Sequence, residues 1–184
     1  PYNDQIYKYA FSPKNVDCMC FCSKNPRPLT KHLDDLSEYK QYWFLTINPY
    51  GRDVEVNVPN YKNVIKTFRE ISDNVGTNAI AWRYDPIFIT DKYDLDFHID
   101  KFEEIASKLN GYTHDCTISF VDLYKKVIRN FPEASEVEVE EQLILSKEAD
   151  KILKNIRQDM YVFALAIKGK KLDSVAFANE INQL

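Results

Sequence analysis

Three cysteines stand at alternate positions in "VDCMCFCSKNP": Cys18, Cys20 and Cys22. Thiolates bind zinc and iron–sulfur clusters, but structural zinc sites use converging ligands, commonly a C-x2-C pair and a second pair elsewhere. Residues two apart on a strand share a face and are about 6.6–7 Å apart. The three histidines form no H-x3-H or H-E-x-x-H pair that would complete such a site. The pattern therefore predicts a buried strand whose thiols pack as small hydrophobic groups, and no metal site.

Charged and polar side chains follow four apolar runs of the sequence. In α/β proteins, ligands bind where the carboxyl ends of parallel strands meet. Arg and Lys can clamp an anion there, Asp can act as a base, and Asn can orient a substrate. We predict catalytic roles for Lys24, Arg83, Asp85 and Asp122. We predict substrate-binding roles for Asn25, Asn48, Tyr50 and Ser119.

A structural interpretation of the same residues stays open. Arg83 and Asp85 could simply pair, while Pro26, Pro49 and Pro86 stop the strands and Asn and Asp residues cap helices. The aromatic residues Tyr50, Tyr84, Trp43 and Trp82 are expected in the core or in a pocket wall.

The elements that must position these groups alternate along the chain. Five short apolar runs predict buried, parallel strands over residues 16–22, 42–47, 78–83, 116–121 and 160–167. Amphipathic stripes predict helices over residues 60–76, 94–111 and 135–157, with Gly76 and Gly111 ending the first two. The fold class expected is α/β with a mostly parallel sheet, as a partial β/α-barrel-like or an open three-layer arrangement.

Composition limits the classes of function. The 184 residues include 45% hydrophobic residues, enough for a sizeable core, and carry a net charge of −4. That charge excludes a broadly basic nucleic-acid binder, so an RNA contact would need a local patch. No run approaches the ~18 apolar residues that span a membrane, and four cysteines without a secretory signal predict reduced thiols and a cytoplasmic protein. Four glycines provide no Gly-rich phosphate loop.

Three further features are expected to be structural or weak signals. His98 lies in an amphipathic helix, where we expect a surface or boundary residue rather than a base. The run "EVEVEE" at residues 136–141 is typical of a solvated helix face. The run "KGKK" at residues 168–171 is a weak phosphate-binding signal.

Several motifs occur in order over residues 1–131: "FCSKNPRPLTKHLDDL", "FLTINPYGRDVEVNVP", "IAWRYDPIFITDKY" and "ISFVDLYKKVIRN". Together they resemble an uncharacterised bacterial domain family of unknown function. Its longer members end in a cysteine cluster similar to that of radical S-adenosylmethionine (SAM) enzymes, and this chain lacks that cluster. The resemblance implies a partial or complete β/α barrel and SAM-linked chemistry.

Residues 132–184 resemble a different family. The "SKEADKIL" helix, the apolar strand followed by "GK", and "FANEINQL" are similar to the middle of the ribosomal RNA large subunit methyltransferase H family. Those SPOUT-class homodimers methylate a pseudouridine of ribosomal RNA with SAM. The resemblance implies cofactor contacts at Leu165 and Gly169, although the glycine-rich loop and the knot segment of that family are absent here.

The chain is thus expected to be a composite, with one domain at residues 1–131, a second segment at 132–184 and a seam near Phe131 and Pro132. Three functions stay open. The first is an α/β enzyme that binds a small molecule or anion and is SAM-linked by resemblance. The second is an incomplete SPOUT-class rRNA methyltransferase that binds ribosomal RNA as a homodimer. The third is a chimeric scaffold with no complete active site.

Overall fold

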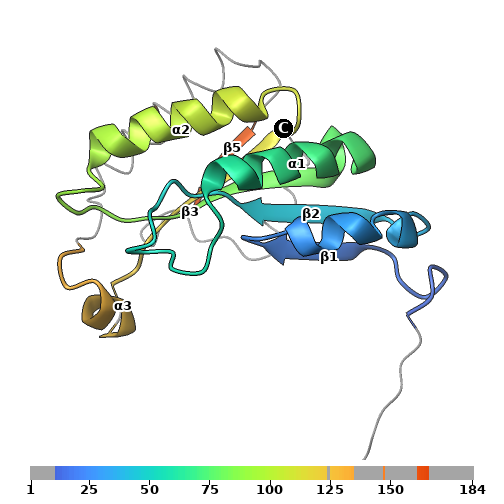
Figure 1. Cartoon of the computed structure of the whole chain (residues 1–184), viewed down its shortest axis with the longest axis horizontal. Coiled ribbons are helices and arrows are strands. Elements are labelled where there is room, and N and C mark those ends of the chain that lie inside the picture. The colour runs from blue at the N-terminus through green and yellow to red at the C-terminus, as the bar shows by residue number, and fades with distance from the viewer. Residues whose placement is uncertain (1–10, 124, 135–146, 148–160, 166–184) are drawn as a thin grey trace, which may run out of the picture. The chain divides into compact units, whose positions relative to one another are not determined.

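The computed structural model of the chain describes residues 11–123, 125–134, 147 and 161–165 (Figure 1). Strands and helices alternate, as predicted. The strands are β1 (Met19–Ser23), β2 (Gln41–Thr46), β3 (Ile80–Ile87), β4 (Asp115–Phe120) and β5 (Tyr161–Leu165). The α-helices are α1 (Tyr61–Val75), α2 (Leu95–Leu109) and α3 (Lys125–Asn130), and the 3-10 helices are η1 (Arg27–His32), η2 (Asp34–Leu36) and η3 (Thr77–Ala79).

The strands form one sheet in the order β1-β2-β3-β4-β5. β1 pairs with β2 and β2 with β3, both in parallel, so that Ser23 lies opposite Leu45 and Leu45 opposite Trp82. The predicted α/β class with a parallel sheet is confirmed. In this register the carboxyl ends of β1 and β2 lie at the same edge.

The chain divides into two compact units: Pro1–Arg83 with Lys108–Asp115, and Tyr84–Ser107 with Cys116–Leu184. The first unit buries the apolar side chains of its central strands, Trp43, Leu45, Ile80 and Trp82, together with Phe68 and Ile71 of α1. The Trp82 indole Nε1 donates a hydrogen bond to the Ile47 carbonyl oxygen at 3.1 Å, which satisfies its polar atom inside this core.

Helix α1 follows its sequence pattern closely. Val64, Ile65, Phe68 and Ile71 are buried at the three- and four-residue spacing of one helix face. The Asn60 side chain caps the start by accepting a hydrogen bond from the Lys62 N–H. At the end, Gly76 has φ +89° and donates its N–H to the Ser72 carbonyl oxygen at 2.8 Å, as the sequence predicted.

The second unit has its own buried cluster, which includes Tyr84, Ile87, Phe102, Ile105 and Ile118. Asp94 precedes α2 and accepts a hydrogen bond from the Phe97 N–H at 2.8 Å, so it caps the start of that helix. Strand β4 alternates between buried and half-buried positions rather than being buried throughout. One face of β4 is therefore only partly covered.

The prediction that the cysteine row is buried is wrong. Cys18, Cys20 and Cys22 are exposed, whereas Cys116 in β4 is buried. β1 lies at the edge of the sheet, and the opposite face of β1 packs inward, with the Phe21 ring stacked on Trp43 at a centroid distance of 4.2 Å. Successive residues of a strand face opposite sides, so the thiols point outward.

The expectation for His98 is also wrong. Its side chain is fully buried, with 0% exposure. His98 extends the apolar face of α2 between Leu95 and Phe102, and it has polar partners inside the unit. The amphipathic pattern could not reveal this, because histidine counts as a polar residue in it.

Other predictions lie outside the described residues: the helix over 135–157 apart from Lys147, the "EVEVEE" run and the "KGKK" run. The strand predicted over 160–167 is present as β5. Within the described part of the chain, no helix is both long and apolar enough to cross a membrane.

Candidate functional site

The Glu55 carboxylate connects two polar side chains that follow the carboxyl ends of β1 and β2. Glu55 Oε1 accepts hydrogen bonds from Lys24 Nζ at 2.5 Å and from Asn48 Nδ2 at 3.2 Å. Lys24 follows β1 and Asn48 lies just beyond β2, so the parallel register places them together. The Glu55 side chain is only 9% exposed and that of Lys24 is 39% exposed. Two of the predicted residues therefore meet, in what we call the rim cluster: Lys24, Asn48 and Glu55.

Glu55 was missed by the sequence interpretation. Glu55 lies in "GRDVEVNVP", the loop after β2. The one sequence feature that points to it is its negative charge, which is opposite to that of Lys24 in the loop after β1. Charge complementarity between two loops at the same sheet edge could have identified it.

Arg83 lies in β3 opposite Thr46 of β2. Its guanidinium Cζ is 4.9 Å from the centre of the Phe44 ring, which is the geometry of a cation–π contact. Stacking on an aromatic face fixes the orientation of the guanidinium plane.

Asp85 and Ser119, two further predicted residues, also meet. The Ser119 hydroxyl donates a hydrogen bond to Asp85 Oδ1. Both residues belong to the second unit and come from neighbouring strands, β3 and β4. The contact fixes the orientation of one carboxylate oxygen and one hydroxyl. A carboxylate base with a hydroxyl partner has this arrangement. A structural cross-strand pair has it equally.

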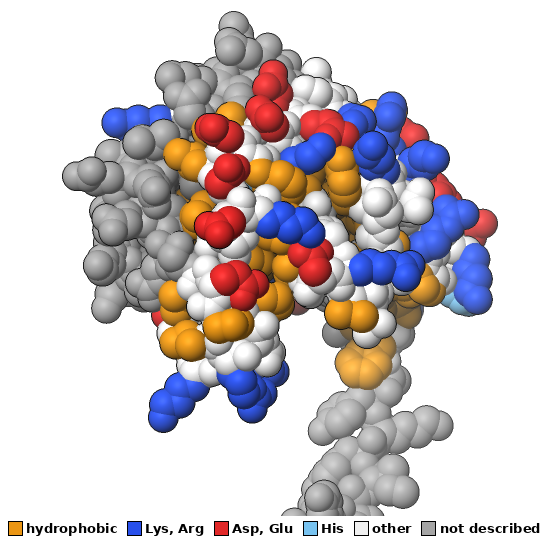
Figure 2. Space-filling view, turned by 60° about the vertical axis from the view of Figure 1, so that its left-hand side comes forward, with side chains coloured by type: hydrophobic (Ala, Val, Ile, Leu, Met, Phe, Trp, Pro, Cys, Tyr) orange, Lys and Arg blue, Asp and Glu red, His pale blue; other side chains and the backbone are white. Residues whose placement is uncertain are grey.

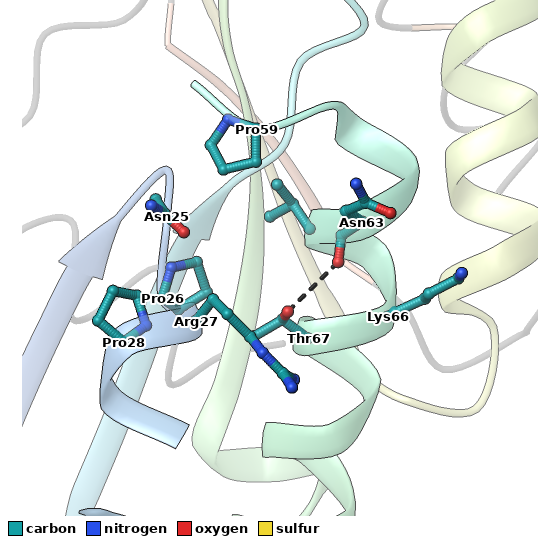
Figure 3. A pocket seen from close by; sticks show the side chains of 9 residues that line it. Asn25, Pro26, Arg27, Pro28, Pro59, Asn63, Lys66 and Thr67 are labelled. Carbon is teal, nitrogen blue, oxygen red and sulfur yellow. Dashed lines mark hydrogen bonds between the residues drawn. The ribbon is translucent and has the colours of Figure 1, made fainter. Parts of the chain in front are cut away.

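A pocket of about 550 Å³ begins directly after β1 (Figure 3). One wall is the segment Asn25–Pro26–Arg27–Pro28, which enters η1, and the other is the first half of α1; Pro59 completes the lining. The α1 residues in the lining are Asn63, Val64, Lys66 and Thr67. Of the predicted site residues, Asn25 is the one in this lining. Arg27, Asn63, Lys66 and Thr67 were missed, because nothing in the sequence shows that η1 packs beside α1.

The remaining predicted residues are not gathered in these places. Tyr50 is buried near the end of β2, and Asp122 is exposed after β4. Leu165 is the last residue of β5, and Gly169 lies outside the described residues. Their predicted roles stay predictions.

The second unit contains a buried polar cluster that we call the core cluster: Tyr84, His98 and the Phe88 carbonyl. His98 Nε2 lies 3.1 Å from the Phe88 carbonyl oxygen and Nδ1 lies 2.9 Å from the Tyr84 hydroxyl. Since a carbonyl oxygen only accepts, Nε2 carries the proton and Nδ1 accepts from the tyrosine. Burial, which disfavours the charged imidazolium, lowers the pKa of His98 to about 4. A neutral histidine with both nitrogens engaged is a structural group.

Two observations bear on the chemistry of the cysteine row. Within the described residues, no group of three or more histidine, cysteine, aspartate or glutamate side chains is arranged to hold a metal ion. The pKa of Cys18 is raised, by desolvation and then by the neighbouring Cys20 thiol. A raised pKa reduces the thiolate fraction and so the nucleophilic reactivity.

Partial similarity links the chain to methyltransferases. The ribosomal RNA large subunit methyltransferase H of Clostridium tetani is 36% identical over 83 residues, which are 45% of this chain and 47% of that protein. A putative ribosomal RNA large subunit methyltransferase H of Methanococcus maripaludis is 34% identical over 85 residues, 46% of this chain and 49% of that protein. The expected resemblance is confirmed, and the chain spans about half the length of these relatives.

A solved structure shares the fold. Spore photoproduct lyase, in complex with dinucleoside spore photoproduct, matches with a TM-score of 0.58 at 15% identity, over 79% of this chain and 51% of the lyase. At this identity the likeness concerns the fold alone.

The expected resemblance to an uncharacterised family is confirmed over a longer stretch than its motifs suggested. The model of the family "Domain of unknown function (DUF1848)" matches residues 1–174 and so continues past Phe131 and Pro132. Because the match covers most of the 184 residues, the chain belongs to the DUF1848 family.

Proposed function

We propose that this chain is a small-molecule-binding domain of an α/β enzyme and that its ligand binds at the carboxyl ends of β1 and β2. The observation that carries the proposal is the pocket that begins at Asn25, directly after β1. Ligand sites of open parallel sheets lie at this edge. A volume of about 550 Å³ is within the range of small-molecule sites.

SAM is the ligand we propose to test first. The methyltransferase relatives support it, as does the resemblance of the motifs to SAM-linked families. The donors in the lining fit the carboxylate and hydroxyl groups of SAM: the amides of Asn25 and Asn63 and the Arg27 guanidinium. The Thr67 hydroxyl donates to the Asn63 carbonyl oxygen at 3.3 Å and can accept a hydrogen bond from a ligand hydroxyl. The prolines and Val64 supply apolar wall for its carbon skeleton. SAM would contribute the methyl group or the radical precursor, and these side chains would bind and orient it.

Two catalytic roles are proposed separately, one in each unit of the chain. Glu55 holds the Lys24 ammonium at the end of β1, one residue before the pocket wall, where Lys24 could bind a substrate anion. We propose that Asp85, oriented by Ser119, is a carboxylate base. Replacing Asp85 should then abolish turnover, and replacing Arg83 in the first unit should weaken ligand binding, each with little loss of fold. A collapse of stability in either variant would make that residue structural.

Calorimetry tests the binding site. Titration of the full chain with SAM and with S-adenosylhomocysteine should show saturable binding that Asn25→Ala and Asn63→Ala each weaken by about tenfold. Asn74→Ala is the matched control, because Asn74 is exposed on the same helix and is not among the lining residues. Binding that all three variants retain would place the ligand elsewhere. Absence of binding, followed by no thermal shift with any compound of a broad metabolite screen, would favour a non-catalytic scaffold.

Activity on ribosomal RNA is the second candidate, and the partial matches to methyltransferase H favour it. Both acidic and basic side chains lie on the surface in Figure 2, so that face is not uniformly basic, and RNA would need a local patch. Transfer of labelled methyl groups from SAM to large-subunit ribosomal RNA, with a dimer in solution, would support this function. Failure of transfer at saturating SAM would exclude it for this chain.

A further inference from the structure

We infer that the pocket beside α1 selects ligands with an anionic oxygen group, a phosphate or a carboxylate, and that this group competes with Glu70 for the Arg27 side chain. The inference rests on the proposed function, since it names the ligand class of the same pocket. It depends on the charge of the lining, the position of α1 and the ion pair that Arg27 now makes.

The lining has a positive charge in an acidic protein. Among its nine described residues, two are cations, Arg27 and Lys66, and none is a carboxylate. The whole chain has a net charge of −4, so the charge of the pocket lining is opposite in sign to the net charge of the chain. In Figure 3 the Lys66 side chain runs away from Arg27, so Arg27 is the cation on which the inference depends.

Helix α1 adds a favourable field. The pocket is bounded by residues of the first two turns of α1, which begins at Tyr61. The first turn has no acidic residue that would neutralise the helix N-terminus. The N–H groups of Lys62, Asn63 and Val64 already donate to Asn60, so α1 contributes only the partial positive charge of its first turn to the lining. The Arg27 guanidinium lies further along the helix, beside Glu70 in the third turn.

Arg27 forms an exposed ion pair with Glu70 on α1. Its Nη1 lies 2.5 Å from Glu70 Oε2, and the two side chains are 66% and 46% exposed. Exposed ion pairs contribute little to stability, because water and salt screen them. In Figure 3 the Arg27 side chain extends past Thr67, beside the α1 wall. A ligand anion can therefore draw the guanidinium from Glu70 at small cost, and its planar fork can bind two oxygens at once.

Amide chemical shifts of the ¹⁵N-labelled full chain test this with inorganic pyrophosphate and with succinate as probes. The shifts should be largest at Asn63, Lys66 and Thr67 and should saturate. Arg27→Gln should weaken binding by at least about tenfold, because a charge-assisted hydrogen bond is lost. Glu70→Gln should tighten it about two- to fivefold, because the competing carboxylate is removed. Arg52→Gln and Glu38→Gln, at exposed residues outside the lining, should change it less than about twofold.

The outcomes separate the two proposals. If uncharged metabolites shift the α1 amides but pyrophosphate and succinate do not, the ligand class is wrong and the proposed site stands. If the anions bind equally well to Arg27→Gln and Glu70→Gln, the competition is wrong. If no compound of either kind shifts these amides, both the inference and the proposed site fall.

Discussion

The rim cluster and the core cluster use similar contacts in opposite settings. In the rim cluster, Glu55 binds a lysine whose side chain is 39% exposed, beside a pocket. In the core cluster, His98 is fully buried and neutral, and both of its ring nitrogens are engaged. A polar group that remains accessible at a strand end can bind a ligand, whereas one enclosed by a helix stabilises the fold. We expect substitutions in the core cluster to reduce stability most, substitutions in the rim cluster to reduce it less, and substitutions in the pocket lining to change binding.

The largest effect should come from His98→Ala. The substitution removes two buried hydrogen bonds and leaves a cavity, which together cost about 3 kcal/mol in the free energy of unfolding. Urea denaturation measures it, with His32→Ala as control, since His32 is half-exposed in a local pair with Asp35. A loss below about 1 kcal/mol, similar to that of an exposed pair, would show that the core cluster is not structural.

The same histidine predicts a pH dependence of stability. Its pKa is about 4 in the folded state against an ordinary value of 6.5, so between these values the unfolded chain binds a proton that the folded chain does not. The free energy of unfolding should therefore fall as the pH is lowered from 6.5 to 4, by up to about 3 kcal/mol, with no further loss from this group below pH 4.

Denaturation at a series of pH values, compared with His98→Asn, isolates this contribution. The variant should be less stable at neutral pH and have a flatter profile between pH 4 and 6.5, because the titrating group is gone. Parallel profiles for the two proteins would assign the pH dependence to other groups.

A smaller effect is expected for Glu55→Ala in the rim cluster. It removes the acceptor of Lys24 and one acceptor of Asn48, and should reduce the free energy of unfolding by about 1–2 kcal/mol. Glu38→Ala, at an exposed glutamate, is the matched control. If Glu55→Ala destabilises the protein as much as His98→Ala, the contrast between the two clusters disappears.

The smallest effect is expected at the edge strand. Cys20→Ser should change the free energy of unfolding by less than about 0.5 kcal/mol, because the thiol is exposed. Cys116→Ser places a hydroxyl in a fully buried position and should cost about 1–2 kcal/mol. Thiol titration of the native protein is an independent check: three thiols should react at once and Cys116 only after unfolding.

The sequence predicted the elements well and the side-chain environments less well. Strand and helix positions follow from apolar periodicity and caps, so the helix from Tyr61 to Val75 and the alternation of strands and helices could be predicted. The order of the strands within the sheet could not. The sequence also could not show which face of the first strand is buried, because "CMCFC" alternates cysteine with methionine and phenylalanine, and all three residue types are buried in many proteins. Which strand lies at the sheet edge decided the outcome for Cys20 and Cys22.

The candidate site was predicted in part for a similar reason. The rule that parallel strands end at one edge brought Lys24 and Asn48 together, and neighbouring strands brought Asp85 and Ser119 together. Glu55, Arg27 and Asn63 lie in a loop, a 3-10 helix and a helix, and their positions depend on packing between segments far apart in sequence. No local pattern encodes such packing.

A crystal structure of the full chain grown with pyrophosphate tests the central claim most directly. We predict one ordered pyrophosphate in the pocket after β1, in contact with Arg27 and the first turns of α1, with the Arg27–Glu70 ion pair broken. Well-ordered pyrophosphate elsewhere, with the Arg27–Glu70 ion pair intact and only solvent in the pocket, would contradict it.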